Sequence, residues 1–152
     1  MDMRERIATG LKDAIKSQDK ARLATLRLIN AAIKDKDIAL RGEGDAGGVS
    51  DTDVLAILGK MVKQRQESAR AYEEGGRLDL SERERDEVLI IEEFLPKKLT
   101  EEEVDKAVDK AIRSTEASSI RDMGRVIGVL KAKYTGQMDF GRVGPMVKDR
   151  LG

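Results

Sequence analysis

A proline break in the middle of the chain constrains the fold more than any other feature. It lies in the stretch Arg77–Val104 (RLDLSERERDEVLIIEEFLPKKLTEEEV), where Leu95 precedes Pro96. Proline donates no backbone hydrogen bond and disfavours helix in its predecessor, so one helix should end near Leu95. We therefore predict two domains, over 1–95 and 100–152, with a hinge at 96–99.

Helix-start patterns lie on both sides of this break. Ser81 followed by Glu84 has the pattern of a capping box and predicts a helix from about Glu82 to Leu95. Thr100 followed by Glu103 repeats the pattern and predicts the next helix. Leu99 and Val104 have the spacing of the accompanying hydrophobic staple, which would fix the direction in which that helix leaves the loop.

The composition favours helices and excludes several kinds of chemistry. Charged residues make up 38% of the 152 residues and hydrophobic ones 39%, with only two prolines, which favours long amphipathic helices and an all-α fold. The chain has no cysteine and no histidine. Disulfides, the usual zinc sites, thiol nucleophiles and imidazole catalysis are thereby excluded. No leader-like or membrane-length apolar run is present, so a soluble, cytoplasmic protein without a membrane partner is expected.

Apolar residues at helical spacing predict an up-and-down helical domain in the N-terminal part. A loop is expected over Gly42–Gly48, where four of seven residues are glycine, and Gly75-Gly76 should end the third helix. Asp19 and the Ser50/Asp53 capping box should start the second and third helices. The predicted buried stripes are Met3, Ile7, Leu11 and Ile15; Leu23, Leu26, Ile29, Ile33 and Asp37, widened by Leu28, Ala31 and Ala32; Val54, Leu58, Met61, Arg65, Ala69 and Tyr72; and Val88, Leu89, Ile91, Phe94 and Leu95.

Three short helices are expected after the break. Val104, Ala107, Val108, Ala111 and Ile112 form a clean stripe for the first. Ser119 with Asp122 should cap the second, whose predicted buried line is Met123, Ile127, Leu130 and Tyr134. Gly124 and Gly128 lie four apart in it, and we interpret them as allowing a close helix crossing. The last helix should start at Gly144-Pro145 and run to about Leu151, with Asp139 available to cap an earlier turn.

The formal net charge is zero, but the charge is unevenly distributed. Residues 1–41 and residues 104–152 each hold 10 Lys or Arg against 6 Asp or Glu, or +4. Residues 42–80 hold 5 against 8 and residues 81–103 hold 4 against 9, or −3 and −5. The basic ends could present positive faces to an anionic partner, or they could pack against the acidic middle.

No catalytic residue, metal site or cofactor site is predicted. The carboxylates of Glu82–Glu87 and the Glu92-Glu93 pair lack a spacing that would place them around one ion. Basic side chains of the third helix (Lys60, Lys63, Arg65, Arg70) could meet phosphates, as could those near the C-terminus. The candidates for binding RNA or a partner are Arg121, Arg125, Lys131, Lys133, Arg142 and Lys148. The four aromatic residues fall mostly on core stripes, so any RNA contact should read shape and backbone.

The whole chain resembles the GatB/YqeY family, whose members are similar to the C-terminal tail of the GatB subunit of aspartyl/glutamyl-tRNA amidotransferase. The resemblance rests on LATLRLINAAIKDK (Leu23–Lys36), VKQRQESARAYEEGGRLDL (Val62–Leu80), EEFLPKKLTEEEV (Glu92–Val104), SIRDMGRVIGVLK (Ser119–Lys131) and GQMDFGRVGPMVKDRL (Gly136–Leu151). It implies two helical domains, the second of three helices, and a role related to holding tRNA. The family label, carbon–nitrogen ligase activity with glutamine as amido-N-donor, belongs to a larger enzyme whose kinase and amidase domains are absent here.

Three functions follow as hypotheses. The first is a non-catalytic module that binds tRNA or an aminoacyl-tRNA-handling protein. The second is a protein–protein adaptor with no nucleic-acid role, in which the acidic hinge region or an exposed helix groove contacts the partner. The third is a genuine glutamine-dependent amidotransferase, for which the residue inventory offers no catalytic group.

Overall fold

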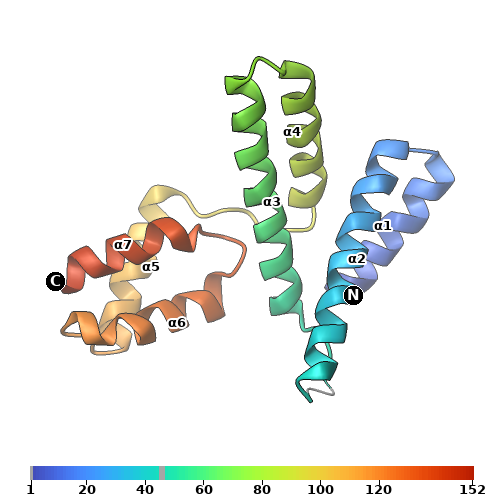
Figure 1. The fold of residues 1–152 in the computed structure, drawn as a ribbon. Helices are drawn as coiled ribbons and strands as arrows, with labels where there is room; N and C mark the ends of the chain where they lie inside the picture. Colours follow the sequence, from blue (N-terminus) through green and yellow to red (C-terminus); the bar gives the residue numbers. More distant parts are fainter. Residues whose placement is uncertain (1, 45–46) are drawn as a thin grey trace. The chain divides into compact units, whose positions relative to one another are not determined.

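A computed structural model describes residues 2–44 and 47–152, which form seven α-helices and one 3₁₀ turn (Figure 1). The all-α prediction is thereby confirmed. The helices are α1 (Met3–Ser17), α2 (Lys20–Gly42), α3 (Asp51–Glu74), α4 (Leu78–Glu92), α5 (Glu101–Ser114), α6 (Met123–Tyr134) and α7 (Phe140–Leu151), and the 3₁₀ turn η1 (Ile120–Asp122) leads into α6.

The chain divides into two compact units, residues 1–95 and 96–152. Each unit has its own hydrophobic cluster. Residues 97–99 are tied within the second unit, because the amide of Leu99 donates to the carbonyl of Gln137 at 2.9 Å and the Gln137 side chain donates to the carbonyl of Lys97 at 3.2 Å. These bonds hold two residues of the predicted hinge, Lys97 and Leu99, to the segment before α7.

In the first unit, α1 and α2 form one helical hairpin and α3 and α4 form another (Figure 1). Asp37 of α2 adds a polar tie, since its carboxylate pairs with Arg4 at 2.8 Å and accepts from the amide of Val49 at 3.0 Å. The buried residues of this core are Met3, Ile7, Ala14, Leu26, Ile29, Ile33, Val54, Leu58, Met61, Val62, Val88, Ile91 and Phe94.

Most predicted stripes reach the core, but four of their apolar members do not, namely Ala31 and the three larger residues that follow. Ile15, Leu28 and Leu89 are exposed by 54%, 48% and 65%. In the last turn of α1 the small Ala14 is buried in place of Ile15. Leu28 and Leu89 lie on helix faces that no other described helix of the first unit covers. The helical period locates the middle of a buried stripe well and its edges less well.

The helix starts at Asp19, Ser50 and Thr100 are confirmed. Asp19 accepts from the amide of Arg22, and the Ser50 hydroxyl accepts from the amide of Asp53 at 3.1 Å. The hydroxyl of Thr100 likewise accepts from Glu103 at 3.1 Å, while the Glu103 carboxylate accepts from the Thr100 amide at 3.1 Å. Both of these reciprocal boxes satisfy amides that a helix N-terminus otherwise leaves free.

The predicted Ser81 cap is wrong. α4 begins earlier, at Leu78, and Ser81 lies inside it with 3% of its surface exposed. The Ser81 hydroxyl donates to the Glu73 carboxylate of α3 at 3.0 Å, and Arg85 also donates to Glu73. This contact with the neighbouring helix gives the hydroxyl a partner other than the backbone. Ser81 therefore does not cap the start of α4. α4 ends at Glu92, and hydrogen-bonded turns continue to Leu95.

The core of the second unit is built from α5, α6 and α7. Its buried residues are Ala107, Val108, Ala111, Val126, Leu130, Met138, Val143 and Val147. Val126 was missing from the predicted line of α6, and Met123, Ile127 and Tyr134 of that line are only partly buried. Arg150 links α7 to α5, because its guanidinium donates to the carboxylate of Asp105 at 2.8 Å and also pairs with Asp109.

The predicted start of the last helix at Gly144-Pro145 is also wrong. α7 begins at Phe140, capped by Asp139, whose carboxylate accepts from the amide of Gly141 at 2.9 Å. Pro145 lies inside the helix. It removes one backbone hydrogen bond in the second turn, and Gly141, one turn earlier, carries no side chain that would add to the crowding around the ring.

Part of the predicted Gly42–Gly48 loop, residues 45 and 46, lies outside the described residues. Gly44 and Gly48 have positive φ angles of 85° and 72°. Gly76 has the left-handed conformation that ends α3, with a φ of 76°. Among the described residues, no helix is long and apolar enough to cross a membrane.

Candidate nucleic-acid interface

α6 is the most one-sidedly charged helix of the second unit. Its twelve residues, MGRVIGVLKAKY, include Arg125, Lys131 and Lys133 and no acidic residue. Val126 and Leu130 face the core and are buried, so the opposite side faces outward. We define the α6 outer face as the exposed residues on this outer side together with Arg121 of η1. Its members are Arg121, Gly124, Arg125, Gly128, Val129 and Ala132.

The two glycines of the α6 outer face do not serve a close helix crossing, contrary to the sequence interpretation. A Cβ placed at Gly124 or at Gly128 would meet no atom within 4 Å. Both glycines therefore lie on open surface, where they leave the helix backbone uncovered between the cations. Phosphates could approach this strip closely, because no side chain stands between them and the helix.

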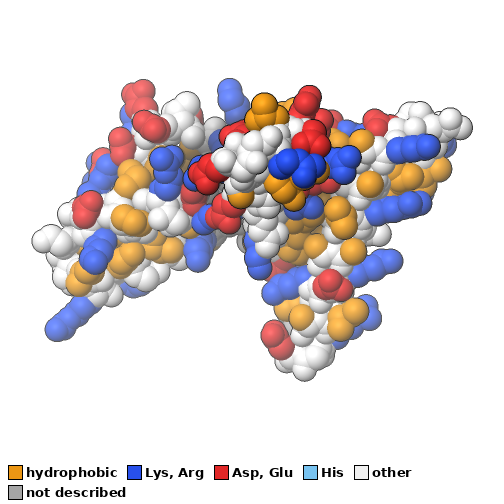
Figure 2. Space-filling model, turned by 45° about the horizontal axis from the view of Figure 1, so that its top comes forward, with side chains coloured by type: hydrophobic (Ala, Val, Ile, Leu, Met, Phe, Trp, Pro, Cys, Tyr) orange, Lys and Arg blue, Asp and Glu red, His pale blue; other side chains and the backbone are white. Residues whose placement is uncertain are grey.

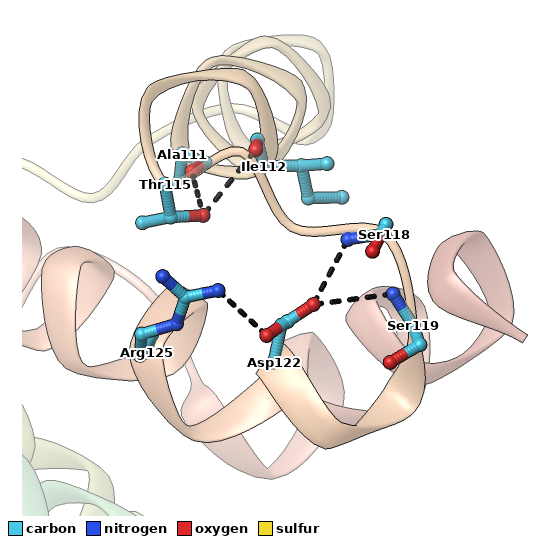
Figure 3. A network of polar contacts seen from close by, with 7 residues as sticks. All are labelled: Ala111, Ile112, Thr115, Ser118, Ser119, Asp122 and Arg125. Atoms are coloured by element: carbon cyan, nitrogen blue, oxygen red, sulfur yellow. Dashed lines mark hydrogen bonds and ion pairs between the residues drawn. The ribbon is translucent and has the colours of Figure 1, made fainter.

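Arg125 is held in place by Asp122, one turn earlier. Its guanidinium donates to the Asp122 carboxylate at 2.6 Å (Figure 3). The other oxygen of Asp122 accepts from the amides of Ser118 at 3.0 Å and Ser119 at 3.3 Å. These amides and Arg125 lower the pKa of Asp122, the Ser118 amide contributing most. The carboxylate thus closes the predicted capping box with Ser119, which lies at the start of η1, the turn before α6, and it also orients a cation that remains 60% exposed.

The C-terminal end of α5 forms the other side of this network. The Thr115 hydroxyl donates to the carbonyl of Ala111 at 2.8 Å, and it is also 3.3 Å from the carbonyl of Ile112 (Figure 3). The same two carbonyls also accept from the backbone amides of Thr115 and Ala117, so the hydroxyl adds to a helix end that is already hydrogen-bonded. The turn from α5 into α6 is therefore built locally, and it fixes where Arg121 and Arg125 emerge.

Lys131 and Lys133 flank the α6 outer face on different sides. They are two positions apart, so their directions around the helix differ by about 160°. Lys131 lies over the ring of Phe140 at 5.9 Å, and Lys133 lies over the ring of Tyr134 at 5.4 Å. Such contacts direct an ammonium group without neutralising it. Both lysines are exposed.

Arg142 and Lys148 of α7 are exposed, but they do not extend the α6 set as one row. They lie six residues apart and point about 120° away from each other around α7, and Asp149 follows Lys148. The structure therefore brings Arg121 and Arg125 together, with Lys131 and Lys133 at the edges, and leaves Arg142 and Lys148 as separate charges.

The basic residues of α3 divide into two groups. Arg65 is half-buried, pairs with Glu87 of α4 at 3.0 Å and donates to the carbonyl of Met61 at 3.2 Å. It is therefore a structural residue. Lys60, Lys63 and Arg70 are exposed. Among residues 2–44 and 47–152, no three acidic side chains lie close enough together to hold a metal ion.

Sequence reasoning missed the surface position of Gly124 and Gly128 and the exposed apolar residues Ile120 and Val129, which are 48% and 41% exposed. One signal was present in the sequence: residues 123–134 hold three cations and no acid, in a chain where acids and bases are equally numerous. A helix with that composition has no carboxylate of its own on its outer face, and Arg125 pairs instead with Asp122 of the preceding turn.

Comparison with known proteins shows one family. The model of the YqeY-like protein family matches residues 4–151, which is nearly the whole chain and includes both units.

Three relatives share part of this sequence. The Clavispora lusitaniae protein named altered inheritance of mitochondria protein 41, mitochondrial, is 35% identical over 56% of this chain and 46% of its own length. The Lachancea thermotolerans protein of the same name is 30% identical over 72% of this chain and 57% of its own length. An uncharacterized Schizosaccharomyces pombe protein is 29% identical over 57% of this chain and 66% of its own length. The matched parts thus span about half to two thirds of these relatives.

Proposed function

This chain belongs to the YqeY-like protein family, and we propose that it is a non-catalytic helical module that binds tRNA, or a tRNA-handling partner, through the α6 outer face. The observation that carries the proposal is the composition of that face: exposed cations, two uncovered glycines and no acidic residue on the helix. The resemblance of the chain to the tail of the GatB subunit of the tRNA amidotransferase supports tRNA as the nucleic acid.

Binding of this kind reads the backbone of the RNA rather than its bases. Arg121, Arg125 and the two flanking lysines supply cations for phosphates. The aromatic rings nearest to them, Tyr134 and Phe140, are partly buried in the core of the second unit and so offer no stacking platform. We therefore expect strong salt dependence and little sequence preference.

The test is tRNA binding at low and near-physiological salt, measured by filter binding or fluorescence anisotropy. Replacing Arg121, Arg125, Lys131 and Lys133 together by Gln should weaken binding at least about tenfold and reduce the salt slope by about 3, since each neutralised contact removes a little less than one released counterion. A control that neutralises Lys60, Lys63, Lys106 and Lys110 changes the net charge equally and should have a much smaller effect. Absence of binding at low salt would end the direct-RNA proposal.

An adaptor function without nucleic acid is the alternative, and the exposed apolar residues Leu28 and Ile38 of α2 favour it. Co-purification with and without nuclease separates the two: an adaptor keeps its partner after RNA is removed, whereas a tRNA-bridged partner is lost.

We propose no amidotransferase chemistry for this chain alone. Ammonia release from glutamine by the purified protein, above a heat-treated control, would overturn that position. A cytoplasmic location stays a prediction, and the two relatives that are named as mitochondrial make fractionation its test.

A further inference from the structure

The first unit carries a second, different exposed surface on α2. The residues Ala21, Ala24, Leu28, Ala31, Asp35 and Ile38 are all exposed and follow one another at alternating spacings of three and four. This is the spacing by which one helix packs along another in a coiled coil. We call these six residues the α2 seam. The core of the unit uses the opposite side of α2, through Leu26, Ile29 and Ile33.

A row of cations runs beside the α2 seam at intervals of seven residues. It consists of Lys20, Arg27, Lys34 and Arg41, all exposed. Within the part of the chain that the structure describes, none of the four forms an ion pair. In a coiled coil this position borders the seam and meets charged residues of the partner. Figure 2 shows Lys and Arg side chains beside exposed hydrophobic ones on the α1–α2 hairpin.

The other edge of the α2 seam lies across a groove from α4. Ala21 and Ala24 border an open groove of about 680 Å³, and its opposite wall is α4, which contributes Glu82, Asp86 and Ile90 among other residues. Lys20, the first cation of the row, also lines this groove, and Arg83 lies among the acidic residues of the α4 wall. A helix lying on the seam would therefore have cations along one edge and, beyond the first turn, a mainly acidic wall along the other. The three alanines of the seam are small, so a partner helix could approach to the lower end of the usual range of about 8–10 Å between axes.

We propose that the α2 seam docks an amphipathic helix of another protein, with an apolar row on the seam and acidic residues along the edge that faces Lys20, Arg27, Lys34 and Arg41. The seam from Ala21 to Ile38 is about 27 Å long, which corresponds to a partner helix of about five turns. Asp35, the one charged residue of the seam, should face a basic or polar residue of the partner and thereby fix the register.

Charge complementarity selects this occupant over two others. A second copy in antiparallel pairing would set the cation row of one α2 against that of the other, which like charges oppose. An RNA backbone would meet the cations, but it would also meet Leu28, Ile38 and the carboxylate of Asp35 in the middle of the surface. An apolar row flanked by cations fits an acidic amphipathic helix better than it fits a polyanion.

The test uses two synthetic helical peptides of about 20 residues that share one apolar row, with Glu along one edge in the first peptide and Lys at the same positions in the second. Binding to the full chain is measured by fluorescence anisotropy, with helicity checked by circular dichroism. The Glu peptide should bind at least about tenfold more tightly. The Arg27→Glu, Lys34→Glu double variant should invert that preference, and Leu28→Ser with Ile38→Ser should abolish binding of the Glu peptide.

The controls are matched on the same unit. Lys63→Glu with Arg70→Glu reverses two exposed charges seven residues apart on α3, and Leu89 is as exposed (65%) as Ile38 (67%). Neither this α3 variant nor Leu89→Ser should change peptide binding. Equal affinity for both peptides, no binding of either one, or an equal response to the control variants would overturn the proposal. It would also be overturned if tRNA displaced the peptide from this face, or if light scattering showed a dimer that Leu28→Ser with Ile38→Ser dissolves.

Discussion

The outer faces of α2 and α6 both expose cations, but they differ in what lies between the cations. On α2 a row of alanine, leucine and isoleucine side chains runs beside Lys20, Arg27, Lys34 and Arg41. On α6 two glycines leave the backbone uncovered between Arg121, Arg125 and the flanking lysines, and Val129 is the one large apolar side chain of that face. The comparison teaches that positive charge alone does not specify the partner. Apolar side chains beside cations fit a protein helix, whereas uncovered backbone beside cations fits phosphates.

The largest expected effect is a loss of stability in one unit that impairs ligand binding by the face of that unit and not by the other. Leu26 is fully buried in the first unit and Leu130 is 1% exposed in the second, so replacing either one by Ala should cost about 3 kcal/mol of unfolding free energy. Leu130→Ala should weaken tRNA binding and spare peptide binding, and Leu26→Ala should do the reverse. Denaturant unfolding followed by circular dichroism, with both binding assays, measures this. If each variant lost both ligands equally, the faces would not belong to separately packed units.

The next effect concerns the open glycines. Replacing Gly124 and Gly128 together by Ala should raise the unfolding free energy by about 1.5–2 kcal/mol, because both positions are helical and a Cβ meets nothing. Gly10 is the contrast, since a Cβ there would lie 3.1 Å from Cζ of the buried Phe94 and should bring no such gain.

The same two glycines also test whether uncovered backbone is what distinguishes the α6 outer face from the α2 seam. Replacing both by Gln keeps the helix but covers the backbone, so tRNA binding should fall about tenfold without loss of stability. Replacing Ala24 and Ala31 by Gln should impair peptide binding in the same way and leave tRNA binding unchanged. Unchanged tRNA affinity in the Gly124→Gln, Gly128→Gln variant would show that the uncovered backbone plays no part in binding.

A smaller gain in unfolding free energy is expected when glycine replaces two residues in the left-handed conformation, one in each unit. Gln18 ends α1 with a φ of 57°, and Glu116 follows α5 with a φ of 54°. Glycine has no Cβ penalty in this region, so Gln18→Gly and Glu116→Gly should each stabilise their unit by about 1 kcal/mol. Thr115→Gly, at a φ of −91°, is the control and should not stabilise. Thermal unfolding of the three variants decides the outcome.

The two capping patterns that flank Pro96 should respond differently. Thr100→Ala removes a formed cap and should cost about 1 kcal/mol. Ser81→Ala should act through lost hydrogen bonding to Glu73, while Arg85 still holds that carboxylate, so the cost should be smaller and the start of α4 unchanged. Amide exchange at residues 78–82 would show whether α4 still begins at Leu78.

The smallest effect is on the dependence of stability on pH. The Thr100 amide lowers the pKa of Glu103, and Arg85 lowers that of Glu73. A lowered carboxylate pKa adds stability that is present above its unfolded value and lost as the pH falls through the folded value. The difference in stability between the parent chain and Glu103→Gln should therefore be seen at pH 7, and it should shrink as the pH falls below the unfolded pKa of about 4.3 and through the lower folded pKa. A difference that grew on acidification would contradict this.

The sequence predicted the features that local physics determines. The boxes at Ser50 and Thr100 form because donor and acceptor lie three residues apart in one helix turn, and the stripe Leu26, Ile29, Ile33 is buried because its spacing matches the helix. The same pattern at Ser81 failed because a residue of the neighbouring helix, Glu73, competes for the hydroxyl.

Other features depend on neighbours that the sequence does not reveal. A glycine pair four apart is compatible with a tight crossing or with open surface, and only the packing of α5 and α7 around α6 decides which. For the site, exposure of the basic candidates followed from the periodicity, whereas the pairing of Arg125 with Asp122 and the divergence of Arg142 from Lys148 required coordinates.

The central claim is that the α2 and α6 faces bind different partners although both are basic. The most direct measurement compares tRNA binding by two variants with the same loss of four charges: Arg121, Arg125, Lys131 and Lys133 to Gln on one face, and Lys20, Arg27, Lys34 and Arg41 to Gln on the other. We expect at least about a tenfold loss of affinity for the first variant and less than about a twofold loss for the second. Equal losses, or a larger loss for the α2 variant, would contradict it.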